Sequence, residues 1–268
     1  CALPICNLEK QKAEHDIKAA MTFPSGMVPQ VAVNDKKMYP IYAKCVELDI
    51  PICINGGIVG PRMPSWPQHV EHFDEVLYDF PELTLGGGLG VAYTEDEEAP
   101  TIASWGNVLL DACRSIGIKS AVFVEPGRSI VASAAITVYR VGTFKEIPGV
   151  RRYVSVDGGM SDNPRPVLYG SGYEAFDVSN VAAERTESAR IVGKHCESGD
   201  VLIFDANLPA GVKVGDLVAT AVTGAYGHAM ASNYNKVPRP AVVFATDGKA
   251  RAVVRRETMD DLVRLDLP

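Results

Sequence analysis

The pattern of apolar residues changes once, near residue 130, and this change limits the folds open to the chain. Before it, short apolar runs that predict strands alternate with longer segments at helical spacing. Such alternation is typical of parallel β/α units. Strands are expected at 17–23, 50–54, 83–85 and 121–124, and helices at 36–49, 66–80 and 102–116. About four units are present and a closed barrel needs eight, so residues 17–132 predict a partial (β/α) TIM-type barrel.

The second part of the chain, residues 133–268, consists of short runs rich in Val, Ile and Thr that Gly and Asp separate. The runs lie at 136–141, 153–156, 190–192, 201–204, 217–220, 242–245 and 250–254. They predict an antiparallel β-barrel or sandwich, so the fold class is α/β plus all-β. Residues 256–265 are expected to form a helix or an extended arm, and residues 1–16 remain unassigned.

Composition excludes several classes of protein. With 268 residues, 47% of them hydrophobic and 22% charged, the chain is expected to fold. The net charge of −7 argues against nucleic-acid binding, and no apolar run approaches the roughly 18 residues that a membrane helix needs. Six scattered cysteines without a C-x-x-C pair favour a reduced, cytoplasmic setting. The first residue is Cys1 and no signal peptide is evident, so we expect a piece of a longer protein.

Two segments that follow predicted parallel strands carry candidate ligand contacts. Glycines at 86–88 and 90 allow backbone amides to approach a phosphate, although such a turn is more often only a turn. Glu125, Pro126, Gly127 and Arg128 follow another strand, and ligands bind at the carboxyl ends of such strands. Arg128 can pair with a carboxylate or phosphate there, or form a surface ion pair.

The β-rich part holds three further candidates. Cys196 and Glu197 place a thiol beside a carboxylate in a loop, where the thiol can give or take a proton or simply pack. Tyr226 lies in a glycine-rich turn and can contact a ligand or pack. The turn-rich stretch 157–169 ends in Arg165 and Tyr169, four residues apart.

From about Leu85 to the C-terminus the sequence resembles the diaminopimelate decarboxylase family, whose members are pyridoxal-phosphate enzymes with an alanine-racemase-like fold. The matching strings are LGGGLG, VEPGRSI, RRYVSVDGGMSDNPRPVLYG, GKHCESGD, GDLVATAVTGAYG, SNYN and RRET. Two of these, CESGD and DGGMSDNPRP, favour diaminopimelate over the substrates of the related ornithine and arginine decarboxylases.

The resemblance implies decarboxylation of meso-2,6-diaminopimelate to L-lysine and CO2, the last step of lysine biosynthesis, with pyridoxal 5'-phosphate as cofactor. Gly88 and residues 125–128 match positions that hold the cofactor phosphate. Arg128, Arg165 and Tyr169 match contacts to a substrate carboxylate.

The remaining matches imply a shared site. Tyr226 matches a contact to cofactor and substrate. Cys196 matches the proton donor to the carbanion left after CO2 departs, and Glu197 matches a contact to the distal amino group of the substrate. In this family the last two side chains enter the partner subunit's active site, which implies a homodimer.

The covalent attachment of the cofactor is not accounted for. The family's lysine lies in a Tyr-Ala-x-Lys-Ala string on an early barrel strand, and no such string occurs here. Tyr42–Ala43–Lys44 is one residue short, and its helical pattern puts Lys44 off the apolar face. The histidine that stacks on the cofactor ring has no counterpart either. We therefore expect the chain to be incomplete and not a competent decarboxylase by itself.

Residues 17–84 resemble a different family, the metal-dependent amidohydrolases of the carboxymuconate-semialdehyde-decarboxylase type. The stretches are FPSGMVPQVAVNDKKMYPIYAKCVELDIPICINGG and PQHVEHFDEVLYDFPELT. That family needs an early H-x-H pair, which is missing, and His69 and His72 are expected on a solvated helix face, so no metal site is predicted. The change of resemblance between Thr84 and Leu85 predicts a chimera. A metal-dependent hydrolase or decarboxylase and a non-catalytic dimerising β-domain are the alternatives.

Overall fold

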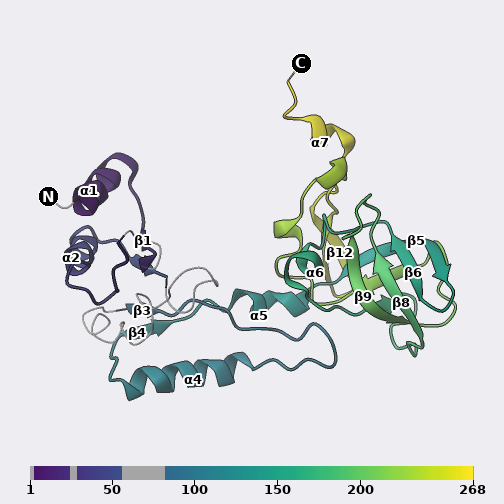
Figure 1. Cartoon of the computed structure of the whole chain (residues 1–268), viewed down its shortest axis with the longest axis horizontal. Coiled ribbons are helices and arrows are strands. Elements are labelled where there is room, and N and C mark those ends of the chain that lie inside the picture. The colour runs from purple at the N-terminus through teal and green to yellow at the C-terminus, as the bar shows by residue number, and fades with distance from the viewer. Residues whose placement is uncertain (1–2, 25–28, 56–81, 268) are drawn as a thin grey trace. The chain divides into compact units, whose positions relative to one another are not determined.

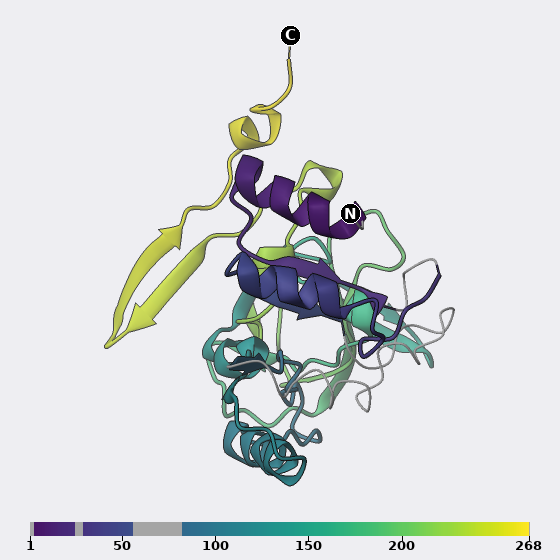
Figure 2. The same cartoon turned by 90° about the vertical axis from the view of Figure 1, so that its left-hand side faces the viewer.

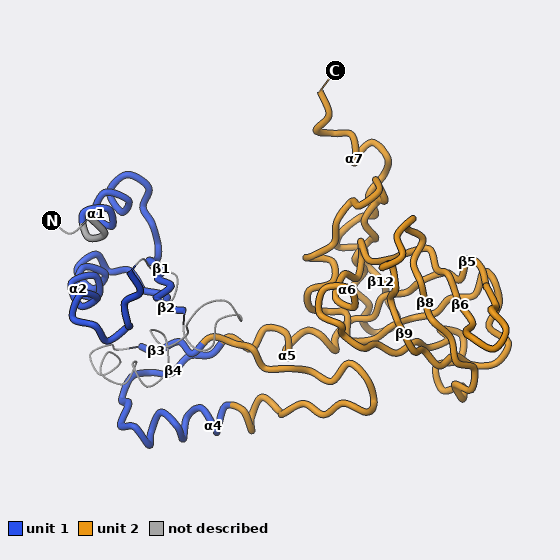
Figure 3. Tube along the Cα trace, in the orientation of Figure 1, with its two compact units in different colours: residues 1–85, 106–124 blue, residues 86–105, 125–268 orange. Residues whose placement is uncertain are grey.

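The computed structural model describes residues 3–24, 29–55 and 82–267, which form two compact units (Figure 1, Figure 3). Unit 1 comprises residues 1–85 and 106–124, and unit 2 comprises residues 86–105 and 125–268. Strands occur in both units, and each unit has its own buried apolar cluster.

Unit 1 confirms the predicted alternation of strands and helices. The elements in this part of the chain are α1 (Leu3–His15), β1 (Ala20–Thr22), α2 (Tyr39–Glu47), β2 (Ile52–Ile54), β3 (Glu82–Thr84), α4 (Ile102–Ser115) and β4 (Ala121–Phe123). Strands β1 and β2 pair in parallel, and so do β3 and β4, as β/α units require. Ala20, Cys45 and Ile50 form a small buried cluster. The helix predicted at 66–80, with His69 and His72, lies outside the described residues.

Unit 2 contains the predicted β-rich part. Its elements after residue 125 are α5 (Gly127–Val131), η4 (Ala132–Ala134), β5 (Thr137–Ile147), β6 (Arg151–Val156), α6 (Arg165–Tyr169), β7 (Phe176–Asp177), β8 (Glu187–Val192), β9 (Val201–Leu208), β10 (Leu217–Thr220), η5 (His228–Met230), η6 (Tyr234–Lys236), β11 (Val242–Thr246), β12 (Lys249–Val254) and α7 (Met259–Val263). Every predicted strand run overlaps a strand, and α7 lies within the predicted closing segment 256–265.

Six strands form one curled sheet in the order β7-β10-β5-β6-β8-β9. The antiparallel expectation was wrong for one pair, because β6 and β8 run parallel. The connection between them includes α6 and β7, so it is long enough to cross over and return in the same direction. A parallel pair brings the carboxyl ends of both strands to the same edge of the sheet.

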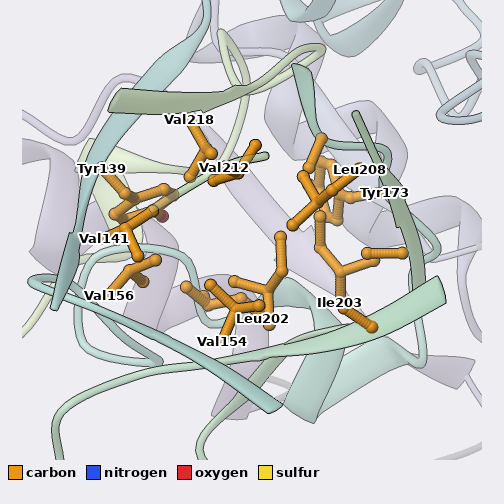
Figure 4. Packing of buried hydrophobic residues seen from close by; sticks show 14 residues of the cluster. Tyr139, Val141, Val154, Val156, Tyr173, Leu202, Ile203, Leu208, Val212 and Val218 are labelled. Carbon is orange, nitrogen blue, oxygen red and sulfur yellow. The ribbon is translucent and has the colours of Figure 1, made fainter. Parts of the chain in front are cut away.

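The inner face of this sheet carries the main core of unit 2. Tyr139, Val141, Val154, Val156 and Leu208 are at most 4% exposed. Figure 4 shows their side chains pointing toward one another across the inside of the curled sheet. Burial alternates at the end of each strand, with Val154 and Val156 buried in β6 and Ala206 and Leu208 buried in β9, since one face there is apolar and packed.

The β11–β12 hairpin forms a separate two-stranded sheet that extends away from the six-stranded one (Figure 2). Asp247 and Gly248 make its turn with φ of +50° and +72°, the left-handed pair that two-residue hairpin turns favour. All six residues of β12 are exposed.

Four cysteines carry free thiols: Cys45 and Cys113 are buried, and Cys53 and Cys196 are exposed. Cys6 is disulfide-bonded, which is an exception to the predicted reduced state of the cysteines. Within the described ranges, no helix combines the length and the apolar character needed to cross a membrane.

Candidate functional site

The glycine-rich loop after β3 lies against residues 125–128, as expected for two loops that follow neighbouring strands. The Glu125 N–H donates to the Gly86 carbonyl at 2.6 Å. A Cβ on Gly87 would overlap the Glu125 carbonyl oxygen, so only glycine permits this approach. Gly88 has φ +89° and open space where a Cβ would stand. The Arg128 guanidinium Nη2 comes within 4.0 Å of the Cβ position of Gly90.

The turn that carries Tyr226 packs on the segment following Arg128. The Gly224 N–H donates to the Ala132 carbonyl at 2.9 Å, and the Thr223 N–H donates to the Ala135 carbonyl at 3.1 Å. Tyr226 itself adopts φ +57°, a left-handed conformation that costs energy for a tyrosine. Its side chain is half exposed. Two backbone hydrogen bonds therefore hold the turn in place, while the phenol of Tyr226 stays half exposed.

Arg165 gathers tyrosine rings from three segments. Its guanidinium carbon lies 5.1 Å from the ring centroid of Tyr93, 5.0 Å from that of Tyr169 and 5.9 Å from that of Tyr226. The arginine is only 6% exposed, and Nη2 donates to Ser171 Oγ at 3.2 Å. Nε is buried and has no hydrogen-bond partner within the described residues. A buried guanidinium with an unused donor is suited to binding an anion.

These contacts form a continuous series within unit 2. It runs from the 86–90 loop to Glu125 and along the chain to residues 132–135, which accept hydrogen bonds from the 223–227 turn. Tyr226 in this turn then lies against Arg165, which also contacts Tyr169. The structure therefore brings Arg165, Tyr169 and Tyr226 into contact, and it connects them through residues 129–135 with Gly88 and residues 125–128 in the same unit.

Cys196 and Glu197 lie on a different loop, between β8 and β9, and both are exposed. Glu197 Oε1 accepts the Gly199 N–H at 3.2 Å, and Oε2 accepts the Tyr234 hydroxyl at 3.5 Å. Among the residues that the structure describes, neither side chain is hydrogen-bonded or ion-paired to the Arg165 cluster. The structure thus does not unite the two predicted sets within one chain.

Burial raises the pKa of two tyrosine phenols in this part of unit 2. It raises the pKa of Tyr173 to about 12, with a further rise from neighbouring Tyr93. It also raises the pKa of Tyr139 well above its ordinary value. The ring of Tyr173 meets that of Tyr93 edge to face, with centroids 5.1 Å apart. Around neutral pH Tyr173 and Tyr139 therefore supply neutral hydroxyls and apolar ring faces.

Sequence reasoning missed Tyr93 and Ser171, which contact Arg165, and Tyr234, which contacts Glu197. The signal for Tyr234 was available, because it lies in the SNYN string. Tyr93 and Ser171 belong to no string that was singled out, and only the fold brings them to Arg165.

Lys44 is engaged elsewhere, in unit 1. Its Nζ pairs with Glu9 at 2.7 Å and with Glu47 at 2.5 Å, and these carboxylates raise the pKa of its ammonium. That Lys44 does not bind the cofactor stays a prediction. In the described part of the chain, His, Cys, Asp and Glu form no group of three or more that could hold a metal ion.

Comparison with known proteins covers most of the chain. The family model described as the pyridoxal-dependent decarboxylase C-terminal sheet domain matches residues 28–224. Diaminopimelate decarboxylase from Bacillus subtilis is 49% identical over 191 residues, which are 69% of this chain and 43% of that protein. The Synechocystis enzyme of the same name is 48% identical over 190 residues, 69% of this chain and 40% of that protein. The chain therefore spans less than half the length of these curated relatives.

A solved structure of a diaminopimelate decarboxylase also resembles this chain. Diaminopimelate decarboxylase from Helicobacter pylori, complexed with L-lysine, superposes with a TM-score of 0.72 and 25% identity, covering 98% of this chain and 70% of that one. The match of the family model extends over well more than half of the sequence and includes the glycine-rich loop, Tyr93, Arg165 and Tyr169, and it ends two residues before Tyr226. The chain belongs to the pyridoxal-dependent decarboxylase family.

Proposed function

We propose that residues 85–268 form the C-terminal part of a decarboxylase that converts meso-2,6-diaminopimelate to L-lysine and CO2. The observation that carries this proposal is the Arg165 cluster, a buried guanidinium with an unused Nε donor among three tyrosines. Curated relatives named diaminopimelate decarboxylase support the choice of substrate. The substrate carries two carboxylates and two amines, so its site needs both cationic and anionic side chains.

The phosphate end of pyridoxal phosphate fits the residues present. Gly88 leaves open space beside a backbone that approaches residues 125–128 closely, and Arg128 adds a positive charge at the same place. When bound, the cofactor supplies an electron sink for the carbon that loses CO2. No lysine is assigned to the covalent attachment of the cofactor, because the Tyr-Ala-x-Lys-Ala string does not occur in the sequence.

The chain's own residues would then bind the substrate and deliver the proton. Arg128, Arg165 and Tyr169 hold a substrate carboxylate, and Tyr226 contacts cofactor and substrate. Glu197 recognises the distal amino group and the Cys196 thiol delivers the proton. Because Cys196 and Glu197 are exposed on a separate loop, we propose that they serve the partner subunit's site in a homodimer. The predicted location of such a protein is the cytoplasm.

The β/α part of the chain would contribute part of a TIM-type barrel, consistent with the parallel pairs in unit 1. An amidohydrolase-like origin for residues 17–84, with a junction at Thr84 and Leu85, also stays a proposal. The family match begins at residue 28 and therefore argues for a decarboxylase origin of part of that segment. Long reads of the source DNA across these two codons decide the matter: reads that continue into this sequence on both sides support a real fusion, and reads that diverge at the junction refute it.

The reaction is tested by grafting. Residues 85–268 are fused to the preceding part of the Bacillus subtilis relative, and lysine release from meso-diaminopimelate is measured with added pyridoxal phosphate. We expect turnover in the graft, at least a hundredfold less in its Cys196→Ala variant, and none in the purified chain alone. A folded graft that makes no lysine would refute the assigned reaction. Lysine formation by the chain alone, abolished by Cys196→Ala, would refute its incompleteness.

A further inference from the structure

The parallel pairing of β6 and β8 places two loops side by side. Residues 157–163 follow the carboxyl end of β6, and residues 193–200 follow the carboxyl end of β8. The first loop leads directly into α6, which begins at Arg165. The second loop carries Cys196 and Glu197. The loop that leads to Arg165 and the loop that carries Cys196 and Glu197 therefore follow neighbouring strands, although these functional side chains are not in contact.

One buried carboxylate joins these loops. Asp200, only 2% exposed, accepts the Met160 N–H on Oδ1 at 2.6 Å and the His195 N–H on Oδ2 at 2.9 Å. One donor belongs to each loop. Within the described residues no cation pairs with Asp200, so its bonds to the two backbone amides are the main compensation for burying its charge.

The glycines around Asp200 are required by this arrangement. A Cβ on Gly159 would lie 2.7 Å from Asp200 Oδ2, and a Cβ on Gly193 would overlap the same carboxylate. Each loop thus has a glycine where it passes the carboxylate. Gly159 of the DGG string and Gly193 of the GKH string are therefore needed because a side chain at either position would collide with Asp200.

Weaker ties surround the carboxylate. The Lys194 N–H donates to the Gly158 carbonyl at 3.0 Å, and His195 Nε2 lies 2.8 Å from Ser161 Oγ. The His195 ring also packs on Tyr234 with centroids 5.2 Å apart, and Tyr234 reaches Glu197. The first two contacts tie the turn of Cys196 and Glu197 to the first loop, and the last two tie it to Tyr234.

We propose that Asp200 is a positioning residue that couples the Arg165 loop to the turn presenting Cys196 and Glu197. This rests on the proposed function for the roles of those three residues. In a homodimer with shared sites, the first loop would serve one site and the second loop the other. A displacement of either loop would then pass chiefly through the Asp200 carboxylate to the neighbouring site.

The test is amide hydrogen exchange of the whole chain, resolved by peptide, in wild type and Asp200→Asn. The asparagine side chain has one oxygen and one N–H₂ group, so it can accept from only one of the two backbone donors, and the other hydrogen bond is lost. We expect exchange to rise at least tenfold in peptides covering both 157–163 and 193–199, with β5 and β10 unchanged. A rise confined to one loop, an equal rise over all peptides, or no rise would overturn the proposal.

Asp162→Asn is the matched control. Asp162 accepts the Gly159 N–H at 2.8 Å and is largely buried, but this bond stays within its own loop. We expect exchange to rise in 157–163 and not in 193–199. Ser161→Ala serves if Asp200→Asn does not fold: with Asp200 intact, exchange in both loops should stay within threefold of wild type. A larger rise would show that Asp200 is not the principal tie.

Alkylation by iodoacetamide reports on the position of Cys196 itself. In Asp200→Asn we expect its rate to rise at least threefold, because the turn no longer holds the thiol in one orientation. Exposed Cys53, which lies in unit 1, is the internal reference and should not change. An unchanged Cys196 rate would overturn the positioning role. Neither hydrogen exchange nor alkylation requires cofactor or turnover. Both results can therefore be interpreted even if the proposed function is wrong.

Discussion

At the scale of single residues, the arginine among tyrosine rings differs from ordinary surface arginines in how little of it meets water. Arg165 is 6% exposed and lies over three rings, whereas Arg190 lies over the single ring of Phe204 in a more exposed place. A guanidinium can stack on rings and donate at its edge at the same time, and an ammonium cannot. The site therefore needs arginine rather than positive charge alone.

Arg165→Lys should lower the free energy of unfolding by about 2 kcal/mol, because stacking is lost and the buried charge is less well solvated. Urea unfolding measures this change. Arg190→Lys is the control and should cost less than about 0.5 kcal/mol. Equal losses in the two variants would contradict the importance that we give to the tyrosine cluster.

At the scale of elements, Glu257 fastens the base of the β11–β12 hairpin. It accepts from Asn233 at 2.6 Å and from the Arg239 backbone at 2.8 Å, and it pairs with the Arg239 guanidinium. These bonds join the SNYN and RRET strings, which lie on opposite sides of the hairpin in sequence. Hydrogen bonds from Arg239 chiefly lower the pKa of Glu257 to about 2.

Because the folded state lowers this pKa, its contribution to stability is present above the ordinary value near 4.5 and is lost as the pH falls toward 2. Glu257→Gln should therefore lower the melting temperature at pH 6, and the difference from wild type should vanish as the pH approaches 2. Thermal unfolding at a series of pH values checks this. A difference that does not depend on pH would contradict a role for the charge.

Elements with a clear period were predictable and single-turn elements were not. The helix at 102–116 and the strand at 201–204 were found as α4 and β9 because several turns or alternations repeat there. Helices α5 and α6 have five residues each, too few to show a period. Helix α1 was missed because its charged residues surround it without a clear apolar stripe.

The strand pairing and part of the site depend on information that is not local. The parallel β6–β8 pair follows from how the chain returns across residues 157–186, which no strand pattern records. The motifs identified Arg165, Tyr169 and Tyr226, and the structure brings them together. Tyr93 joins them from a loop far away in sequence, and Asp200 became recognisable as a link only once both loops were in place.

At the scale of the whole molecule, the core of unit 2 is built almost entirely after residue 138. All fourteen buried members of its cluster lie between Tyr139 and Val218, and Tyr93 only packs against them. The sheet therefore does not need unit 1 for its apolar contacts. This supports separate folding of the β-rich part.

A fragment of residues 125–268 should accordingly fold and unfold cooperatively, as followed by near-ultraviolet circular dichroism on heating. Val154→Asp, at a fully buried position, should abolish the transition in the fragment. Val150→Asp, at a position 71% exposed, should leave it within a few degrees. A wild-type fragment without a cooperative transition would contradict the independence of this core.

The β11–β12 hairpin has a consequence for how the protein behaves at high concentration. A ribbon of two strands has two outer edges, each a row of backbone groups that a strand of another molecule can pair with. Lys249 and Arg251 put positive charge along β12, so ribbons of two molecules repel each other when they approach through this strand. Dissolved salt screens that repulsion over about 10 Å at 0.1 M. The protein should therefore stay in solution best at low ionic strength, and a high salt concentration should promote edge-to-edge pairing of ribbons, which is detected as turbidity.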